Sequence, residues 1–346
     1  MKRILPTQMS KGLFRPIGGV IACLLFVCLS TRTFGDFEAA AAYSAQRGER
    51  ALLVWQNGRL ILERYSTPEP SNREHIFSIT KSLCALGAFT AFGRRPAQLD
   101  EPVSLTLTEW QNHPQKRRIT LRDLLNQTSG LSPGFEALYA ANVRDKNQRA
   151  LNLPMTSAPG EKFVYGPSHY EVLEIFMARK LGESPLAWME RALFGPLGIR
   201  PGGWRRDRLG NPYFSAGAQV SARNLLAIGH LVRRKGWHWI FPLVPSSPMR
   251  QVSLGSAPNP IYGLGFWLNR FATEKTAVEI DVEEAISAGT DWERACLSRS
   301  APADMIAMVG SRGQRVYVSP SSKLVIVRLG SRAGFRDPDF LRRFFR

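Results

Sequence analysis

Short apolar runs bounded by turn residues predict strands at both ends of the chain. Near the N-terminus, two such runs at residues 51–55 and 60–65 flank Asn57-Gly58, and Asn-Gly between apolar runs is a strong hairpin signal. Three further runs follow near the C-terminus, at residues 305–309, 315–319 and 323–329. Glycines and a Pro-Ser-Ser turn separate these three runs, which therefore predict a three-stranded meander.

The centre of the chain shows a different pattern, in which apolar residues recur every three to four positions, as in amphipathic helices. Together with a C-terminal helix, the predicted helices cover residues 37–46, 78–92, 119–125, 168–181, 185–193, 221–234 and 337–345. The proline-rich stretch 237–254 is predicted to be a loop. We therefore expect an α+β fold: an antiparallel sheet built from both chain ends and flanked by helices, with an inserted, mainly helical subdomain.

The first 35 residues have the pattern of an export signal. Lys2 and Arg3 precede an apolar stretch at residues 16–29, and small residues near position 35 suit signal cleavage. The stretch is shorter than the about 20 residues of a membrane span. An uncleaved anchor, a lipoprotein cleavage box ending at Cys23 and a buried helix of the fold stay open as alternatives. We expect residues 1–35 to be a signal peptide or membrane anchor, and the protein to be exported to the periplasm or cell envelope.

The remaining residues, 36–346, are enough for one large domain, and no linker or internal repeat divides them. We expect its sheet part at about residues 36–92 and 290–346. The helical part is expected at about residues 93–289.

The chain is strongly basic, with a formal net charge of +18. Its basic residues occur in short scattered pairs such as Arg94-Arg95 and Arg233-Arg234, without a long basic run or a nucleic-acid-binding motif. This distribution favours a solvated basic surface over a nucleic-acid partner. Association with an anionic membrane or a cell-envelope polymer through that surface is also compatible with it.

The residue types that bind metals show no metal-site spacing. The five histidines are dispersed, with no His-Glu-x-x-His pattern and no closely spaced cysteine pair after residue 35. Cys84 and Cys296 allow one disulfide but no disulfide framework, and Cys84 is expected to pack in the core. We expect neither a metal nor a cofactor.

Ser78 begins the helix predicted at residues 78–92, and Lys81 follows one turn later. Residues three apart on a helix share a face, so the Ser78 hydroxyl and the Lys81 amine can touch. A desolvated amine can accept the serine proton, and the positive end of the helix dipole favours developing negative charge. On its own, the motif is more typical of a capping serine followed by a surface lysine.

Ser-x-x-Lys is a catalytic motif of serine β-lactamases and penicillin-binding proteins. Further segments extend the resemblance over about residues 40–335, and they lie at residues 52–65, 99–103, 110, 119–131, 163–165, 221–225, 262–265 and 310–330. The chain resembles the serine β-lactamase superfamily, in the branch that contains class C β-lactamases, DD-peptidases, related esterases and 6-aminohexanoate-dimer hydrolases. The resemblance implies a β-lactamase/transpeptidase-like fold.

The resemblance also implies a role for each matching residue. Ser78 would be the acylated nucleophile, and Lys81 would help to remove its proton. Tyr165 matches the tyrosine of the family's Tyr-x-Asn motif and would be a general base or proton relay, because a neighbouring Lys⁺ favours its phenolate form. The backbone N–H groups of Ser78 and Gln314 would form the oxyanion hole.

Two positions depart from the family's pattern. The asparagine of Tyr-x-Asn is Pro167 here, and Ser168 or His169 is expected to replace part of its role. The family's Lys-Thr-Gly or His-x-Gly box is expected at Ser311-Arg312-Gly313, with Ser311 in place of the cation and with Ser311 and Gly313 contacting substrate. Since the missing groups contact the amide and carboxylate of family substrates, their loss favours an ester or a neutral amide.

The sequence therefore predicts an exported serine hydrolase that acts through an acyl-enzyme on a small-molecule or peptide-like ester or amide. The chain has no Gly-x-Ser-x-Gly motif, which disfavours an α/β-hydrolase. The alternative is a catalytically degenerate protein of the same fold that binds a cell-envelope or acidic polymer, because a fold does not guarantee activity.

Overall fold

The structure, a computed structural model, describes residues 37–67, 74–332 and 334–345. The expected signal peptide or anchor at residues 1–35 lies outside these ranges. Among the helices of the described ranges, none is long and apolar enough to cross a bilayer.

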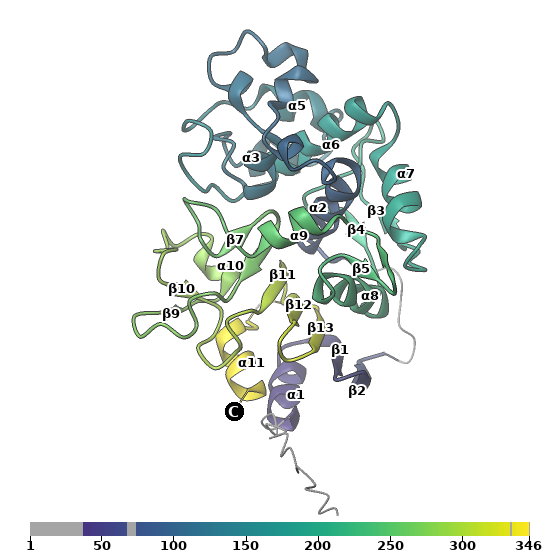
Figure 1. Cartoon of the computed structure of the whole chain (residues 1–346), viewed down its shortest axis with the longest axis vertical. Helices are drawn as coiled ribbons and strands as arrows, with labels where there is room; N and C mark the ends of the chain where they lie inside the picture. The colour runs from purple at the N-terminus through teal and green to yellow at the C-terminus, as the bar shows by residue number, and fades with distance from the viewer. Residues whose placement is uncertain (1–36, 68–73, 333, 346) are drawn as a thin grey trace, which may run out of the picture. The chain divides into compact units, whose positions relative to one another are not determined.

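A seven-stranded antiparallel sheet runs through the described fold (Figure 1). Its strands are β1 Glu49–Gln56, β2 Arg59–Tyr65, β7 Tyr262–Gly263, β8 Phe266–Leu268, β11 Ile306–Gly310, β12 Gln314–Ser319 and β13 Leu324–Gly330. The order is β2-β1-β13-β12-β11-β8-β7, so a strand from the start of the chain pairs with the last strand, and Leu53 lies opposite Val327. This topology confirms the α+β prediction and the assembly of the sheet from both chain ends.

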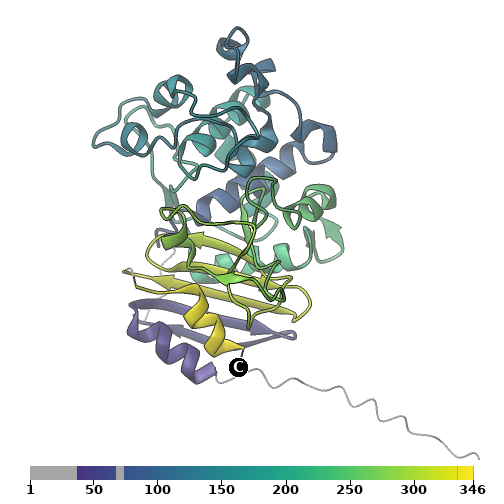
Figure 2. The same ribbon diagram turned by 90° about the vertical axis from the view of Figure 1, so that its left-hand side faces the viewer.

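Helices cover both faces of this sheet. On one face, α1 (Phe37–Gln46) and α11 (Asp337–Phe344) pack together, as Figures 1 and 2 both show. On the other face lies α8 (Ala222–Arg233), where a Cβ at Gly229 would be only 2.4 Å from Cγ1 of Val325. Glycine is therefore needed for this close approach of helix and sheet.

The remaining elements include the two longest helices of the described ranges, α2 and α6, and several short ones. The helices are α2 Ile79–Phe92, α3 Leu121–Asn126, α4 Phe135–Tyr139, α5 Lys146–Asn152, α6 Ser168–Leu181, α7 Pro185–Met189, α9 Ser246–Val252 and α10 Val282–Ala285. Single turns of 3₁₀ or π helix lie at Pro96–Leu99, Val103–Leu105, Thr108–Trp110, Lys116–Arg118 and Glu190–Phe194. Two-stranded pairs form from β3 Gly203–Trp204 with β4 Ala218–Gln219, β5 Trp237–His238 with β6 Phe241–Pro242, and β9 Val278–Glu279 with β10 Ala295–Cys296.

The helix predicted at Thr120 is present as α3 and begins with a capping box. The Thr120 side chain accepts from the Asp123 backbone N–H, while the Asp123 carboxylate accepts from the backbone N–H of Thr120. Asn126 at its end accepts a hydrogen bond from the N–H of Leu264 at 2.7 Å. This bond ties α3 to the loop between β7 and β8.

The middle of the chain differs from the sequence-based expectation in three ways. The stretch 237–254 is not a loop but contains the β5–β6 hairpin and α9. Pro245 and Pro248 fall at the cap and first turn of α9, where a helix does not need their missing N–H groups. β7 and β8 extend the sheet, and they are too short to show an alternating pattern. Because α8 also packs on the sheet, residues 93–289 are not one uninterrupted helical insertion.

Candidate active site

Ser78 occupies the N-cap position of α2. Phe77 before it has a φ angle of 46°, a left-handed conformation that bulky residues rarely adopt. The Ser78 side chain makes no capping hydrogen bond, and its Oγ lies 3.2 Å from Nζ of Lys81 instead. The hydroxyl and the amine therefore meet on one face of α2, with Oγ free to react.

Lys81 is buried, with 3% of its surface exposed. Its Nζ also donates to the carbonyl oxygen of Ser215 at 2.9 Å, and the ion pairs formed by the described residues do not include Lys81. Burial lowers the pKa of Lys81 to about 7, although the more distant carboxylate of Glu171 acts in the opposite direction. A neutral amine can donate to Ser215 while its lone pair accepts the Ser78 proton.

Tyr165 lies beside this pair, with its ring centroid 4.8 Å from Nζ of Lys81. Burial raises the pKa of Tyr165 to about 12, against a smaller lowering by its hydrogen bond with Ser78. The sequence argument favoured a phenolate because it assumed a charged lysine. Because burial keeps its pKa high, Tyr165 stays a phenol near pH 7, suited to donate a proton rather than to accept one. The desolvated Lys81 amine is neutral in about half of the molecules at that pH.

Ser78 and Tyr165 line a pocket of about 230 Å³. The other residues of its walls are Phe77, Phe135, Tyr139, Ala216, Glu283, Ile286, Val309, Gly310 and Ser311. An adjoining pocket of about 390 Å³ shares Phe135, Tyr165 and Ile286 with it and includes the aromatic rings of Phe163 and Trp292. Together they form a cleft that suits a substrate with an apolar group next to the reacting carbonyl.

The β11–β12 turn forms the wall that faces the start of α2. Gly310 packs against the backbone there, because a Cβ at this position would lie 2.3 Å from the carbonyl oxygen of Ile76. Ser311 follows and lines the pocket. In the part of the chain that the structure describes, neither the Ser311 N–H nor the Ser78 N–H has an acceptor. Two free amide donors on facing walls have the arrangement of an oxyanion hole.

The structure does not bring Gln314 to this wall. Gln314 is buried in β12 opposite Gly310, and its side-chain amide bonds the N–H and the carbonyl oxygen of Gly330 at 3.0 and 2.7 Å. The segment Ser311-Arg312-Gly313 is a turn, and the residue that lines the pocket is Ser311, three positions before Gln314. Gly313 is buried behind Ser311.

The residues expected to replace the missing asparagine also lie away from the pockets. Pro167 caps α6, and Ser168 behind it is fully buried, with an Oγ that has no partner in the described ranges. The buried ring of His169 contacts Ser129 Oγ at 2.9 Å and the Val164 carbonyl oxygen at 2.7 Å. Neither side chain lines the pockets, so neither takes the place of the asparagine at a substrate.

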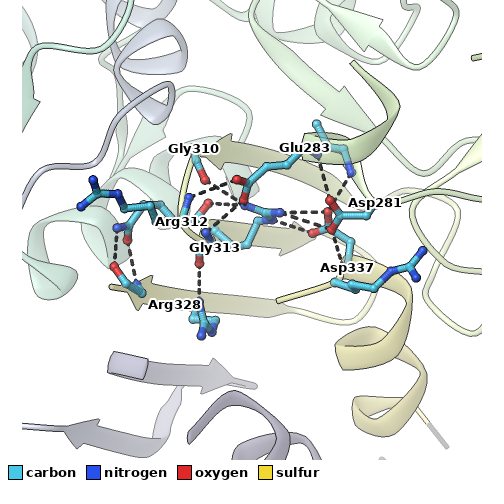
Figure 3. A network of polar contacts seen from close by, with 12 residues as sticks. Asp281, Glu283, Gly310, Arg312, Gly313, Arg328 and Asp337 are labelled. Atoms are coloured by element: carbon cyan, nitrogen blue, oxygen red, sulfur yellow. Dashed lines mark hydrogen bonds and ion pairs between the residues drawn. The ribbon is translucent and has the colours of Figure 1, made fainter. Parts of the chain in front are cut away.

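Glu283 on α10 is a pocket residue that the sequence analysis missed (Figure 3). Its carboxylate accepts hydrogen bonds from the N–H groups of Arg312 and Gly313, at 3.1 and 3.0 Å. These bonds hold the turn that presents the Ser311 amide. No local pattern signals this role, because the bonded residues are about thirty positions apart in the chain.

Behind the turn, the guanidinium of the fully buried Arg315 contacts three carboxylates, those of Glu283, Asp281 and Asp337 (Figure 3). Burial and the neighbouring Asp337 raise the pKa of Asp281 to about 7, whereas Arg315 keeps that of Asp337 low despite its burial. The Arg315 cation thus faces the negative charges of Glu283 and Asp337, and also that of Asp281 when Asp281 is ionised. Glu283, whose side chain is 30% exposed, presents the excess negative charge to the pocket.

Arg312 follows Ser311 and is exposed. It lies in the turn with a φ angle of 65°, and its guanidinium is 5.2 Å from the ring centroid of Phe77. The exposed Arg312 therefore stands beside the pocket rim, whereas the pocket wall itself carries Glu283.

A second buried network of polar side chains is linked to Lys81 through Ser215. The Glu171 carboxylate accepts hydrogen bonds from the N–H and Oγ of Ser215, the residue whose carbonyl oxygen binds Lys81. Glu171 also pairs with Nζ of Lys146 at 2.9 Å, and both side chains are fully buried. Tyr139 OH contacts Ser215 Oγ at 2.7 Å. The one sequence signal was the spacing of Glu171 and Glu174, which share a face of α6.

Metal ligands are not gathered at this site. In the described ranges, the His, Cys, Asp and Glu side chains form no group of three that would hold a metal ion. Cys84 and Cys296 are both buried and unpaired, so they do not form the disulfide that the sequence allowed, and Cys84 packs in the core.

A comparison of the sequence with known families identifies the class of protein. The sequence model of the Beta-lactamase family matches residues 36–344. The chain belongs to the beta-lactamase family, as its sequence resemblance implied.

Solved structures share the fold at low sequence identity. A protein from Bacteroides dorei assigned as a beta-lactamase is 17% identical with a TM-score of 0.67, over 88% of this chain and 95% of that chain. A protein from Bacillus anthracis assigned as a 6-aminohexanoate-dimer hydrolase is 18% identical with a TM-score of 0.65, over 86% and 76%. EstCE1, a hydrolase with promiscuous acyltransferase activity, is 19% identical with a TM-score of 0.64, over 89% and 98%. A comparison with curated proteins found no match.

Proposed function

We propose that this protein is a serine hydrolase that cleaves an ester or amide through an acyl-enzyme. The observation that carries the proposal is the 3.2 Å contact between Ser78 Oγ and the buried amine of Lys81. A serine hydroxyl needs a base to become a nucleophile, and an amine with a pKa of about 7 is in its neutral, basic form in about half of the molecules at pH 7. Membership of the beta-lactamase family supports the same chemistry.

In the proposed reaction, Lys81 accepts the Ser78 proton while Oγ attacks the substrate carbonyl carbon. The N–H groups of Ser78 and Ser311 stabilise the negative oxygen of the tetrahedral intermediate. Collapse of the intermediate expels the alcohol or amine, which takes a proton from the Tyr165 phenol, and the Lys81 ammonium returns that proton to Tyr165. Water then attacks the acyl group, again losing a proton to Lys81, and Ser78 leaves with its proton restored.

The pocket favours neutral substrates with an apolar group. Pro167 has no side chain that could bind a substrate amide, and Glu283 would repel a substrate carboxylate. The aromatic walls of the adjoining pocket suit an apolar acyl or alcohol part. An ester or neutral amide is thus a better substrate than a β-lactam or a D-Ala-D-Ala peptide, both of which carry a carboxylate.

A fluorophosphonate probe, which reacts with activated serines, tests the nucleophile. We expect the wild type to be labelled and Ser78→Ala to remain unlabelled, with the exposed Ser253→Ala as a matched control that is labelled like the wild type. Equal labelling of the wild type and Ser78→Ala would contradict the proposal. A wild type that stays unlabelled while folded would support the rival, a degenerate protein that binds a cell-envelope or acidic polymer.

A substrate screen on the same sample sharpens the substrate class. We expect hydrolysis of short-chain esters to be faster than that of a neutral amide, and both to be faster than that of a β-lactam or a D-Ala-D-Ala peptide. Preference for either carboxylate-bearing substrate would show that Glu283 does not set the selectivity.

We also propose that the protein is exported, on the basis of the charge and apolar pattern of residues 1–35. Mapping the N-terminus of protein recovered from cell fractions tests this. A start near residue 36 in the envelope fraction is the expected result. An intact Met1 in the cytosolic fraction contradicts export.

A further inference from the structure

The tip of the β5–β6 hairpin carries the three most exposed large hydrophobic side chains of the described ranges. Trp239, Ile240 and Phe241 are 76%, 76% and 68% exposed, and Trp237 adds 42%. Trp239 and Ile240 form the turn itself, between the pairs Trp237–Pro242 and His238–Phe241. Scattered exposed apolar residues are ordinary, but four within five positions at a hairpin tip form a contiguous patch of the kind that marks an interaction site.

The backbone conformation of the turn is a second unusual feature of this hairpin. Trp239 has a φ angle of 52°, a left-handed conformation in which two-residue hairpin turns favour Gly, Asn or Asp. A tryptophan here is sterically unfavourable, and its exposed ring gains little from the core. Strain that does not serve packing points to a role for the side chain outside the fold.

Basic residues flank the patch. Arg234 and Lys235 are exposed where α8 ends, directly before β5, and Figure 1 shows β5 beside α8. The guanidinium of Arg233 lies 4.7 Å from the ring centroid of Trp55 on β1, which brings the β1–β2 hairpin and its exposed Arg59 to the same corner. The ion pairs recorded for the described residues leave Arg59, Arg234 and Lys235 without a carboxylate partner.

We propose that the β5–β6 hairpin binds the surface of an anionic membrane. Trp239, Ile240 and Phe241 would enter the boundary between headgroups and acyl chains, a position that tryptophan prefers, while Arg234 and Lys235 face lipid phosphates. A second copy of this chain fits the patch less well, because two molecules with a net charge of +18 repel each other. The proposal does not depend on the hydrolase activity.

The test places a polarity-sensitive fluorophore on the turn of the full-length chain through Ile240→Cys. Cys23 and Cys28 are replaced by alanine, and Cys84 and Cys296 are buried and so shielded from labelling. Vesicles of equimolar phosphatidylcholine and phosphatidylglycerol are added. We expect a blue shift and protection from an aqueous quencher, and a much smaller response with phosphatidylcholine alone. The label reports on the hairpin itself, so binding through residues 1–35 alone does not produce the signal.

The matched control is the same label at Leu105→Cys, an exposed hydrophobic position outside the patch, which should not respond. In the unlabelled chain, Trp239→Ser with Phe241→Ser should weaken recruitment to the anionic vesicles about tenfold. Arg234→Gln with Lys235→Gln should weaken it at low salt and flatten its salt dependence. Because all four side chains are solvent-exposed, circular dichroism melting curves should match the wild type.

Three results would overturn the proposal. The first is a label at position 240 that stays exposed to the quencher with anionic vesicles. The second is an equal response at position 105. The third is a blue shift that grows with protein concentration without vesicles, which would identify the patch as a contact between two copies of the chain.

Discussion

Two buried lysines in this molecule stand in one polar region and have opposite pKa shifts. Lys146 is fully buried but contacts the carboxylates of Glu171 and Glu174, at 2.9 and 3.4 Å. Burial alone would lower its pKa, and the two carboxylates outweigh burial and raise it. Lys81 is buried to a similar degree but contacts a hydroxyl and a carbonyl oxygen, and its pKa falls to about 7.

The difference shows that the contacting group, and not burial, separates a structural lysine from a catalytic candidate. A carboxylate in contact keeps Lys146 charged, so it links α5 and α6 as a buried ion pair. Glu171 does not contact Lys81: Ser215 lies between them and orients the amine, and the distant carboxylate raises the Lys81 pKa by less than burial lowers it. The same carboxylate thus supports the fold on one side and positions the proposed base on the other.

Removing the proposed base should have the largest effect. We expect Lys81→Met to lower kcat/KM by about 10²–10⁴-fold, since this is the usual contribution of a general base. The same substitution should raise the melting temperature near pH 7. A pKa lowered from 10.5 to about 7 means that the buried amine destabilises the fold at pH values below 10.5, fully so below about 7.

Melting curves across pH provide the check on Lys81→Met. Its stability advantage over the wild type should shrink as pH rises toward 10.5, because the unfolded wild-type lysine then also loses its proton. An advantage that grows with pH would contradict a buried neutral amine.

Removing the charge of Glu171 should mainly damage the fold. We expect Glu171→Gln to destabilise the protein by about 3–5 kcal/mol, because it leaves Lys146 with a single, more distant carboxylate. Denaturant unfolding measures this loss. The matched variant Glu174→Gln should have a smaller effect, since its carboxylate lies farther from Lys146. Equal effects would mean that the 2.9 Å contact is not the dominant pair.

The pH dependence of hydrolysis should report the Lys81 pKa. Because the reaction needs the neutral amine, kcat/KM should fall about tenfold per pH unit below the pKa of about 7 and level off above it. Glu171 raises the pKa of Lys81, so a Glu171→Gln protein that remains folded should show this decline at lower pH. If kcat/KM of Glu171→Gln declined at the same pH as that of the wild type, the titrating group would not be Lys81.

The negative charge of Glu283 on the opposite wall should have a smaller effect, which is measured as a change in substrate choice. We expect Glu283→Gln to improve hydrolysis of a carboxylate-bearing ester about tenfold relative to its neutral analogue, because the repulsion across the pocket is removed. Competition between the two esters measures the ratio. An unchanged ratio would mean that Glu283 holds the β11–β12 turn but does not affect substrate choice.

Much of the fold could be predicted because local chemistry signals it. Asn57-Gly58 between apolar runs identified the first hairpin, and Thr120 as a capping residue identified the start of α3. Ser78 and Lys81 could be paired because three-residue spacing on a helix implies contact. The hairpin at residues 237–242 escaped prediction, because its turn uses a tryptophan in a conformation that normally indicates glycine or asparagine.

By itself, the sequence determined the first hairpin, the C-terminal meander, the main helices and the Ser78–Lys81 pair, since these depend on patterns within a few residues, and its motifs indicated the family. Only the tertiary structure decided which groups share the pocket with that pair. Burial lowers the pKa of Lys81 to about 7 and keeps Tyr165 protonated. The turn after β11 places Ser311 at the pocket, where Gln314 was expected. Glu283 reaches the same pocket from a helix about thirty residues away in the chain. Such properties depend on distances between segments remote in sequence, which no local pattern encodes.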